Sequence, residues 1–391
     1  MTSATDLVPL WNRTAEWDRR SMMVREARSF VYLSTYYVEY DAYGIGMITA
    51  LIEAQRRGVA VNLLIDGFGQ SLGGVLMTPA DRAALDALLD ELRRLGGVVT
   101  TYRPRHRLQQ WLGGGQHVKI QVSEAGEAIF GSSNLSRSSF EKWNEYSVAL
   151  RGPVTRVLLE SYRQIGGIVD DAHLYALTTV AESQGVGPGS KGEADIPLDY
   201  WLCNPNTHQG VLGPLGWRGV NVVTDRFIER IATARHSIWM TSFYFKPVEP
   251  LVAALVAAAK RGVQIEVHHS HRDALPATDL AWIAAAAHYD RLLPSGVRVF
   301  ENLHGEHSKI VLIDGDWVAF GSYNFEHAAH DRLAEAMLVS SDARAIQPAE
   351  DIFAELRRHP DNVLVTAQVL DELPPRLKQR QRRLGRFKRW M

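Results

Sequence analysis

Two stretches of the chain contain histidine and lysine at matched spacing, a combination suited to attack on a phosphodiester. The first begins at His117 with HVKIQVSEAGEAIFGSSNLS, and the second begins at His307 with HSKIVLIDGDWVAFGSYNFE. From each histidine, steps of 2, 14, 15, 17 and 28 residues lead to Lys, Gly, Ser, Asn and Glu. These residues are Lys119, Gly131, Ser132, Asn134 and Glu145 in the first copy, and Lys309, Gly321, Ser322, Asn324 and Glu335 in the second. Agreement at six positions indicates two halves of one site.

In each copy the histidine and the lysine lie on one face of a predicted strand, because alternate side chains of a strand project the same way. A neutral imidazole can attack the phosphorus, and an ammonium group can neutralise a non-bridging oxygen. Two such half-sites make one complete site, in which one histidine attacks and the other protonates the leaving oxygen. The two histidines should then titrate apart, and this chemistry requires no metal or other cofactor.

Three further positions of each copy are expected to support this chemistry. The serines and asparagines follow tight glycine turns, so we expect them to donate hydrogen bonds to the phosphate oxygens. Each glutamate can hold the far nitrogen of a histidine and fix its tautomer. The predicted phosphate-binding residues are Ser132, Asn134, Ser322 and Asn324, and the predicted histidine partners are Glu145 and Glu335.

The segments that must position these residues alternate between strand and helix patterns. The run FVYLSTYYV is aromatic and β-branched, GMITALIEAQRR has helical periodicity up to Gly58, and VAVNLLID is typical of a buried strand. The second half repeats this order with SIWMTSFYF and KRGVQIEVHHS, at a period of about 200 residues. The sequence therefore predicts an α/β protein made of two similar α/β/α sandwich lobes, with one active site at their interface.

A chain of 391 residues exceeds the usual size of a single hydrophobic core, which favours two domains. We assign residues 1–178 to an N-terminal lobe and 216–370 to a C-terminal lobe. Residues 179–215 include AESQGVGPGSKGEAD and are predicted to be a linker or surface loop. Residues 371–391 form a polybasic tail in which Lys and Arg alternate with Leu, Phe and Trp.

Composition indicates the class of protein and its location in the cell, but it does not identify the substrate. Apolar residues make up 46% and charged residues 22%, as in ordinary globular proteins, and the net charge of −1 means that attraction to polyanions must be local. The single cysteine, Cys203, cannot form an internal disulfide. The N-terminus lacks the pattern of a secretory signal, and no run of about 18 apolar residues occurs. We expect a cytoplasmic protein that associates peripherally with the inner face of the cell membrane.

The duplicated pattern resembles the signature of the phospholipase D superfamily, His-x-Lys-x4-Asp followed by Gly-Ser-x-Asn. The resemblance covers most of residues 20–345. It implies a site between two lobes, a phospho-histidine intermediate formed on His117, and His307 as the acid.

Two features depart from that signature. The first copy has Glu124 where the second keeps Asp314, and Ala329 and Leu333 replace polar residues common after the second Gly-Ser-x-Asn. Seven residues beyond the histidine, the acid points to the opposite face of the strand, so we expect it to support a turn. The second departure is expected to alter the support of His307 or the acceptor pocket.

The superfamily includes phospholipases, cardiolipin synthases, phosphatidylserine synthases and nucleases, so the resemblance leaves the substrate open. Two segments resemble bacterial cardiolipin synthases: the arginine-rich YRPRHRLQQWLGGGQH before the first motif, and SFYFKP at 242–247. We therefore predict a phosphatidyltransferase acting on a phospholipid and an alcohol. The alternatives are a phospholipase D-type hydrolase, another phosphodiesterase such as a metal-independent nuclease, or a silent membrane-binding scaffold.

Two basic segments predict contact with an anionic membrane surface. The loop before His117 combines Arg103, Arg105 and Arg107 with Trp111, which suits head-group binding and insertion of an apolar tip. A solvated loop with one packed tryptophan is the alternative. The C-terminal tail can bind an anionic leaflet at about 1 kcal/mol per basic residue, and nucleic acid is its less favoured partner.

A group of three histidines suggests a metal at first sight. These are His268, His269 and His271, near the end of a predicted strand. No cysteine and no familiar ligand spacing accompanies them, so packing or substrate contact is the favoured interpretation.

Overall fold

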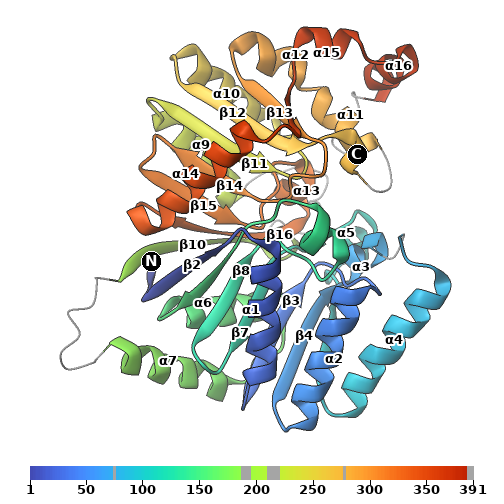
Figure 1. The fold of residues 1–391 in the computed structure, drawn as a ribbon, viewed down its shortest axis with the longest axis vertical. Coiled ribbons are helices and arrows are strands. Elements are labelled where there is room, and N and C mark those ends of the chain that lie inside the picture. Colours follow the sequence, from blue (N-terminus) through green and yellow to red (C-terminus); the bar gives the residue numbers. More distant parts are fainter. Residues whose placement is uncertain (74–75, 186–194, 209–220, 276–278, 385–391) are drawn as a thin grey trace.

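A computed structural model describes residues 1–73, 76–185, 195–208, 221–275 and 279–384. Each half of the chain builds one mixed β-sheet with helices on both faces, and the two sheets form two lobes (Figure 1). The predicted α/β class and the duplication are both confirmed.

The first sheet is formed by the N-terminal half. In spatial order its strands are β2 (Asp6–Leu10), β9 (Ser147–Arg151), β8 (Glu127–Gly131), β7 (Lys119–Ser123), β3 (Phe30–Thr35), β4 (Ala60–Asp66) and β5 (Val98–Tyr102). The strands β3, β4 and β5 are parallel, and the others pair antiparallel. All six residues of β3 are buried, because helices cover both faces of this sheet.

The second sheet repeats this order. Its strands are β1 (Thr2–Ala4), β10 (Ile196–Cys203), β16 (Leu333–Ser340), β15 (Trp317–Gly321), β14 (Ile310–Ile313), β11 (Ser237–Ser242), β12 (Gln264–Ser270), β13 (Arg298–Asn302) and β17 (Asn362–Leu364). From β10 to β13 each strand corresponds to a strand of the first sheet, from β2 to β5. The short β6 (Gly115–Gln116) leaves the first lobe and pairs with β16 of the second.

Helices cover both faces of each sheet. On the first sheet, α1 (Arg13–Glu26), α2 (Ala42–Arg56) and α4 (Pro79–Arg94) pack on one face, and α6 (Val154–Gln164) and α7 (Asp171–Gly185) on the other. On the second, α9 (Val222–Thr233) and α10 (Glu249–Lys260) lie opposite α14 (Ala343–Arg358). The shorter elements are α3 (Gly67–Gly73), α5 (Arg107–Trp111), η2 (Ser138–Lys142), α8 (Pro205–His208), η4 (Arg272–Ala274), α11 (Leu280–Ala286), α12 (Tyr289–Leu292), η5 (Leu293–Ser295), α13 (His327–Asp331), α15 (Ala367–Asp371) and α16 (Pro375–Leu384).

The predicted linker is partly wrong. Residues 196–203 form β10, which lies between β1 and β16, because Ile196, Leu198, Trp201 and Cys203 are buried side chains. The rest of the predicted linker includes residues 186–194 and 209–215, which lie outside the described part of the chain. The neighbouring Gly- and Ser-rich residues made this segment look like a loop, although β10 takes the place in the second sheet that β2 takes in the first.

The two lobes share one apolar core. One cluster of buried side chains contains residues of β7 and β8 together with residues of β14, β15 and α14. The rings of Tyr146 and Phe320, one from each half, stand edge to face with centroids 5.6 Å apart. Burial on this scale fixes the lobes against each other, so side chains from both can form one rigid site.

Candidate active site

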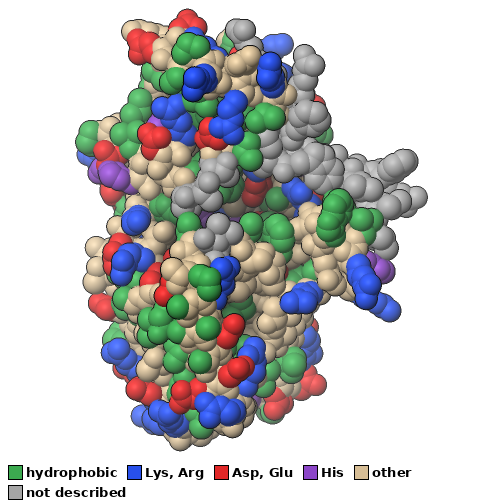
Figure 2. Space-filling view, turned by 90° about the vertical axis from the view of Figure 1, so that its right-hand side faces the viewer, with side chains coloured by type: hydrophobic (Ala, Val, Ile, Leu, Met, Phe, Trp, Pro, Cys, Tyr) green, Lys and Arg blue, Asp and Glu red, His purple; other side chains and the backbone are tan. Residues whose placement is uncertain are grey.

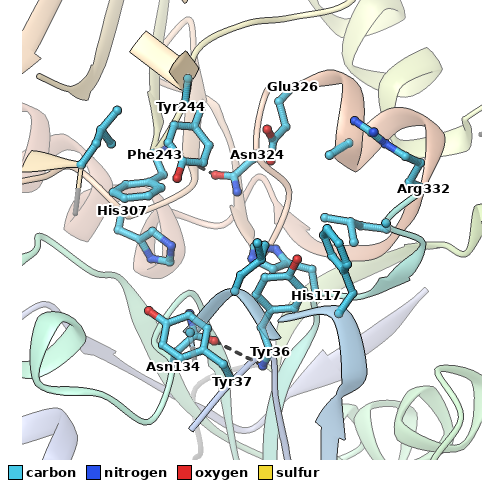
Figure 3. A pocket seen from close by; sticks show the side chains of 18 of the residues that line it. Tyr36, Tyr37, His117, Asn134, Phe243, Tyr244, His307, Asn324, Glu326 and Arg332 are labelled. Carbon is cyan, nitrogen blue, oxygen red and sulfur yellow. Dashed lines mark hydrogen bonds between the residues drawn. The ribbon is translucent and has the colours of Figure 1, made fainter. Parts of the chain in front are cut away.

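A cavity of about 410 Å³ lies where the two lobes meet, and both motif histidines line it. Figure 3 shows its lower wall, with Tyr36, Tyr37, His117 and Asn134, and its upper wall, with Phe243, Tyr244, His307 and Asn324. Each residue of one wall has its repeat counterpart in the other. The duplicated half-sites therefore face each other across one space.

Each histidine is held by the glutamate of the opposite lobe. His307 Nδ1 lies 2.8 Å from Glu145 Oε2, and His117 Nδ1 lies 3.0 Å from Glu335 Oε1. All four side chains are buried. With Nδ1 engaged, Nε2 of each ring is the nitrogen left for chemistry. Sequence spacing predicted glutamate partners but did not reveal that the pairs cross between the lobes.

Backbone hydrogen bonds between the lobes set this crossing. The N–H of His117 donates to the carbonyl of Ala334 at 2.8 Å, and the N–H of His307 donates to the carbonyl of Asn144 at the same distance. Each acceptor immediately precedes the glutamate that holds the histidine. One hydrogen bond thus fixes the register between each histidine and its partner.

The two lysines lie beside the histidines but point at the backbone. Lys119 Nζ donates to the carbonyl of His117 at 2.7 Å, and Lys309 Nζ donates to that of His307. Both ammonium groups are fully buried. Burial lowers the pKa of Lys309 to about 8, and that of Lys119 falls well below its usual value for the same reason.

The serines do not occupy the place that the spacing predicted. Ser132 Oγ donates to Glu145 Oε2 at 2.5 Å, and Ser322 Oγ donates to Glu335 Oε2 at 2.5 Å. Each hydroxyl also accepts a backbone N–H at 3.0 Å, and neither side chain lines the cavity. The expectation that they bind phosphate is therefore corrected: they fix the glutamates, because the turn directs their hydroxyls into the protein.

The asparagines do line the cavity. Asn134 Oδ1 accepts a hydrogen bond from the N–H of Tyr36 at 3.2 Å, and Asn324 Oδ1 accepts one from Phe243 at 3.3 Å. The acceptor end of each amide is thus used, which leaves the NH₂ group to donate. Asn134 Nδ2 is buried and has no hydrogen-bond partner among the described residues.

The charges around the two histidines differ. Burial lowers the pKa of His307 to about 3, opposed first by the carboxylate of Glu145. Burial also lowers the pKa of His117, and there the next causes are the cations Lys119 and Lys309. Burial raises the pKa of Glu335 to about 8, whereas His307 and Lys309 outweigh burial at Glu145 and bring its pKa to about 2. A carboxylate therefore supports His307 more strongly than His117.

The motif acids anchor neighbouring strands. Asp314 accepts the N–H groups of Arg235, His236 and Ser237 at 2.7–2.9 Å, which fixes the start of β11. Within the described residues, Glu124 accepts one hydrogen bond, from the N–H of Arg28 at 2.5 Å. The expected turn support is thus a link to the adjacent strand, and the longer glutamate side chain provides one hydrogen bond in place of three.

Aromatic rings enclose both imidazoles, a feature that the spacing argument missed. Tyr36 stands edge-on to His117 at 4.7 Å between centroids, and Phe243 takes the same relation to His307 at 4.7 Å. Trp143 stacks on His307 at 5.0 Å. The signal was available, because an aromatic pair ends the first strand pattern of each repeat. In the second copy the position that corresponds to Trp143 is Leu333, which also lines the cavity. Ala329, the other departure from the signature, is buried in the core of the second lobe.

The cavity mouth has an exposed apolar rim beside the basic loop. Phe68, Leu72 and Leu76 line the cavity and are 36%, 50% and 48% exposed. Trp111, at the end of α5, is 80% exposed, and Leu112 next to it lines the cavity. Arg103, Arg105 and Arg107 are all exposed. Figure 2 shows hydrophobic side chains gathered beside the hollow between the lobes.

The other two sequence candidates lie away from the histidine pair. His268 stacks on Phe300 at 4.6 Å and His269 bonds the hydroxyl of Tyr289 at 2.7 Å, and the described residues contain no group of metal-binding side chains. The interpretation of this group as packing agrees with these contacts. The tail forms α16, with Leu377 buried and Arg380 paired to Asp279 at 2.7 Å; residues 385–391 lie outside the described part.

A family model described as "Cardiolipin synthase, PLD-like domain" matches residues 22–165 and 227–357. The chain therefore belongs to this phospholipase D-like family. It is 24% identical over 318 residues to a cardiolipin synthase of Geobacillus kaustophilus, covering 78% of this chain and 56% of that protein. It is 25% identical over 338 residues to cardiolipin synthase B of Escherichia coli, covering 84% of this chain and 74% of that protein.

Solved structures show the same fold. A phosphatidylserine synthase of Haemophilus influenzae aligns with a TM-score of 0.71 at 12% identity, covering 100% of this chain and 95% of the other. The chain spans only 56% and 62% of the length of two cardiolipin synthases that it matches. Within the described ranges, no helix has the length and apolar character needed to cross a bilayer.

Proposed function

We propose that this protein is a phosphatidyltransferase of the cardiolipin synthase type, which moves a phosphatidyl group to an alcohol through a phospho-histidine on His117. The observation that supports this best is the crossed arrangement of His117 with Glu335 and His307 with Glu145 around one cavity. Membership of the family and the names of the relatives point to the same chemistry.

In the first step, Nε2 of His117 attacks the phosphorus of the donor lipid and the bond from phosphorus to the head-group oxygen breaks. His307 gives its proton to that oxygen, and the head group leaves as an alcohol. In the second step, an acceptor alcohol gives its proton to His307 and its oxygen displaces His117. The product carries the phosphatidyl group on the acceptor, and both histidines return to their starting states.

The charges favour this division of roles. A nucleophilic imidazole must be neutral, and cations are the first charges that disfavour protonation of His117. A general acid must hold a proton, and the first charge acting on His307 is the carboxylate of Glu145. The negative charge of a bound phosphodiester opposes the lowering of both pKa values, and at His307 it acts together with Glu145 to favour the protonated form that an acid needs.

The phosphate is held by cations and amides. We propose that Lys119 and Lys309 turn from the backbone carbonyls toward the non-bridging oxygens when a lipid enters. Asn134 and Asn324 donate through the NH₂ groups that their own contacts leave available. Because these donors are buried, each hydrogen bond to the developing charge is stronger than it would be in water.

We propose that lipid reaches the cavity from an anionic membrane surface, at the inner face of the cell membrane. The apolar rim of Phe68, Leu72, Leu76 and Trp111 provides the side chains that insert, and Arg103, Arg105 and Arg107 provide the charge. The polybasic tail, residues 371–391, adds further attraction. The rim residues of α3 extend the surface beyond the loop that the sequence predicted.

The test is incubation of the purified protein with phosphatidylglycerol vesicles and mass spectrometry of the lipid products. We expect cardiolipin and free glycerol from the wild type and neither from His117→Ala or His307→Ala. Phosphatidic acid as the only product would make the protein a hydrolase. Lack of any lipid product, together with metal-independent cleavage of DNA, would assign it to the nucleases.

A further inference from the structure

The repeat makes the two walls of the cavity directly comparable, and they differ in charge at one position. Glu39 follows β3, its counterpart after β11 is Lys246, and both line the cavity. The ammonium of Lys246 lies 3.0 Å from Glu326 Oε2, and both side chains are buried. The counterpart of Glu326 is the uncharged Ser136. At these positions one wall thus contains an ion pair, and the other contains a carboxyl group and an uncharged serine.

Glu39 differs from Lys246 in its surroundings. No Lys or Arg side chain in the part of the chain described forms an ion pair with it, although it lines the cavity. Burial and the neighbouring Asp41 raise the pKa of Glu39 to about 7, and the cations Lys142 and Arg137 act in the opposite direction. The carboxyl group of Glu39 is therefore available to a ligand that enters the cavity.

The wall that contains Glu39 has a second polar group without a hydrogen-bond partner among the described residues, the Nδ2 of Asn134. Asn134, whose Nδ2 is buried without a partner, precedes Leu135, whose carbonyl accepts the N–H of Glu39 at 3.0 Å. Tyr37 lies within electrostatic range of both Glu39 and Glu145, and burial and Glu39 raise its pKa, so its hydroxyl stays neutral. In Figure 3 Tyr37 lies on the side of the cavity where His307 projects. The hydroxyl-bearing side chain of Tyr37 therefore lies on the side of the proposed acid.

We infer that Glu39 and Tyr37 form the subsite that binds the free hydroxyl groups of a glycerol-type polyol, both as the leaving head group and as the acceptor. This inference rests on the proposed function, in which His307 handles the alcohol oxygen. Both His307 and Glu39 line the cavity, so a polyol whose reacting oxygen lies at His307 can turn its other hydroxyls toward the wall that contains Glu39. The carboxyl group of Glu39 accepts hydrogen bonds and the hydroxyl of Tyr37 both donates and accepts them, which suits the hydroxyl groups of a polyol.

The reaction leaves these hydroxyls unchanged. The reacting hydroxyl gives its proton to His307, its oxygen forms a bond to phosphorus, and the bond from phosphorus to His117 breaks. The other hydroxyls stay bound at Glu39. Water and simple alcohols lack them, so the subsite raises transfer to a polyol over hydrolysis and over transfer to ethanol.

The experiment is a competition within one vessel. Phosphatidylglycerol vesicles are incubated with isotope-labelled glycerol and ethanol at equal concentrations, and mass spectrometry gives the ratio of labelled phosphatidylglycerol to phosphatidylethanol. We expect Glu39→Ala to lower this ratio about tenfold, the usual effect of losing hydrogen bonds to a carboxyl, and Glu39→Gln to lower it less. Transfer to ethanol should also fall, because the same subsite binds the leaving head group of the donor, but the ratio compares only the two acceptors. Glu53→Ala, on the exposed side of α2, is the matched control and should leave the ratio unchanged.

Because the ratio is internal, partial loss of folded protein does not alter it. An unchanged ratio in both Glu39 variants would overturn the inference while leaving the proposed transferase intact. A third acceptor, ethanolamine, tests whether the subsite binds an ammonium group in place of a polyol. If the wild type prefers ethanolamine to glycerol and Glu39→Ala removes that preference, the polyol inference is overturned. Absence of transfer to any alcohol by the wild type would overturn both the subsite and the proposed function.

Discussion

The crossed pairs predict that Glu145→Gln separates the two steps of the reaction. The substitution keeps the size of the side chain and removes one negative charge 2.8 Å from His307 Nδ1. For two charges about 4 Å apart at an effective dielectric constant of about 20, that charge is worth about 4 kcal/mol to the imidazolium. General acid catalysis itself contributes about 10²- to 10⁴-fold. We therefore expect turnover of natural phospholipids to fall about 10²- to 10³-fold.

The assay uses a soluble diester whose leaving group is p-nitrophenolate, which departs without a proton. Glu145→Gln should release one equivalent of p-nitrophenolate per site in a fast burst, followed by slow turnover, because His307 no longer activates the acceptor. The phosphorylated histidine should then be detectable by mass spectrometry on His117. Glu335→Gln is the matched variant, since it removes the corresponding partner of His117 and should slow the burst itself.

Two outcomes would refute this reasoning. A burst in Glu335→Gln, with none in Glu145→Gln, would exchange the roles of the two histidines. If both variants turned over the phospholipid and the p-nitrophenyl diester at the rates of the wild type, the carboxylates would not act through the histidines. Circular dichroism and thermal unfolding of each variant would exclude a loss of fold as the cause.

Three further predictions concern stability and the membrane. Burial raises the pKa of Glu306 from 4.5 to about 7, so the stabilising contribution of its protonated form is complete below pH 4.5 and is lost as pH rises through 7. The variant Glu306→Gln has the residue found at the repeat counterpart, Gln116, and should lose less thermal stability between pH 5 and 8 than the wild type does. Asp314→Ala, which removes three hydrogen bonds at a residue with φ of 54°, should lower the unfolding free energy by about 2–4 kcal/mol, and Glu124→Ala by about 1 kcal/mol, in urea titrations. Replacing Arg103, Arg105 and Arg107 by Ala should weaken sedimentation with anionic vesicles about 100-fold at low salt, at about 1 kcal/mol per charge, while activity on a soluble diester stays constant. The control replaces two exposed arginines that do not line the cavity, Arg156 and Arg358, and an equal loss per charge there would refute a defined membrane face.

The sequence by itself determined the duplication, the α/β class and the residues that meet at the centre. Strict spacing between His117 and Glu145, repeated between His307 and Glu335, is a local property of the chain, because strand, turn and strand follow one another in each copy. Apolar periodicity likewise predicted the helix that ends before Gly58, found as α2 at Ala42–Arg56. These features depend on neighbours in the sequence, so local patterns suffice to predict them.

Only the tertiary structure decided which partner each residue takes. Spacing cannot distinguish Glu145 bound to its own His117 from Glu145 bound to His307, because the pair that forms joins two lobes and residues 162 positions apart. The same limit explains Ser132, whose hydroxyl is directed at Glu145, and the strand β10, whose place is set by β1 and β16. Long-range packing fixes these contacts, and the shared core of the two lobes holds them in place.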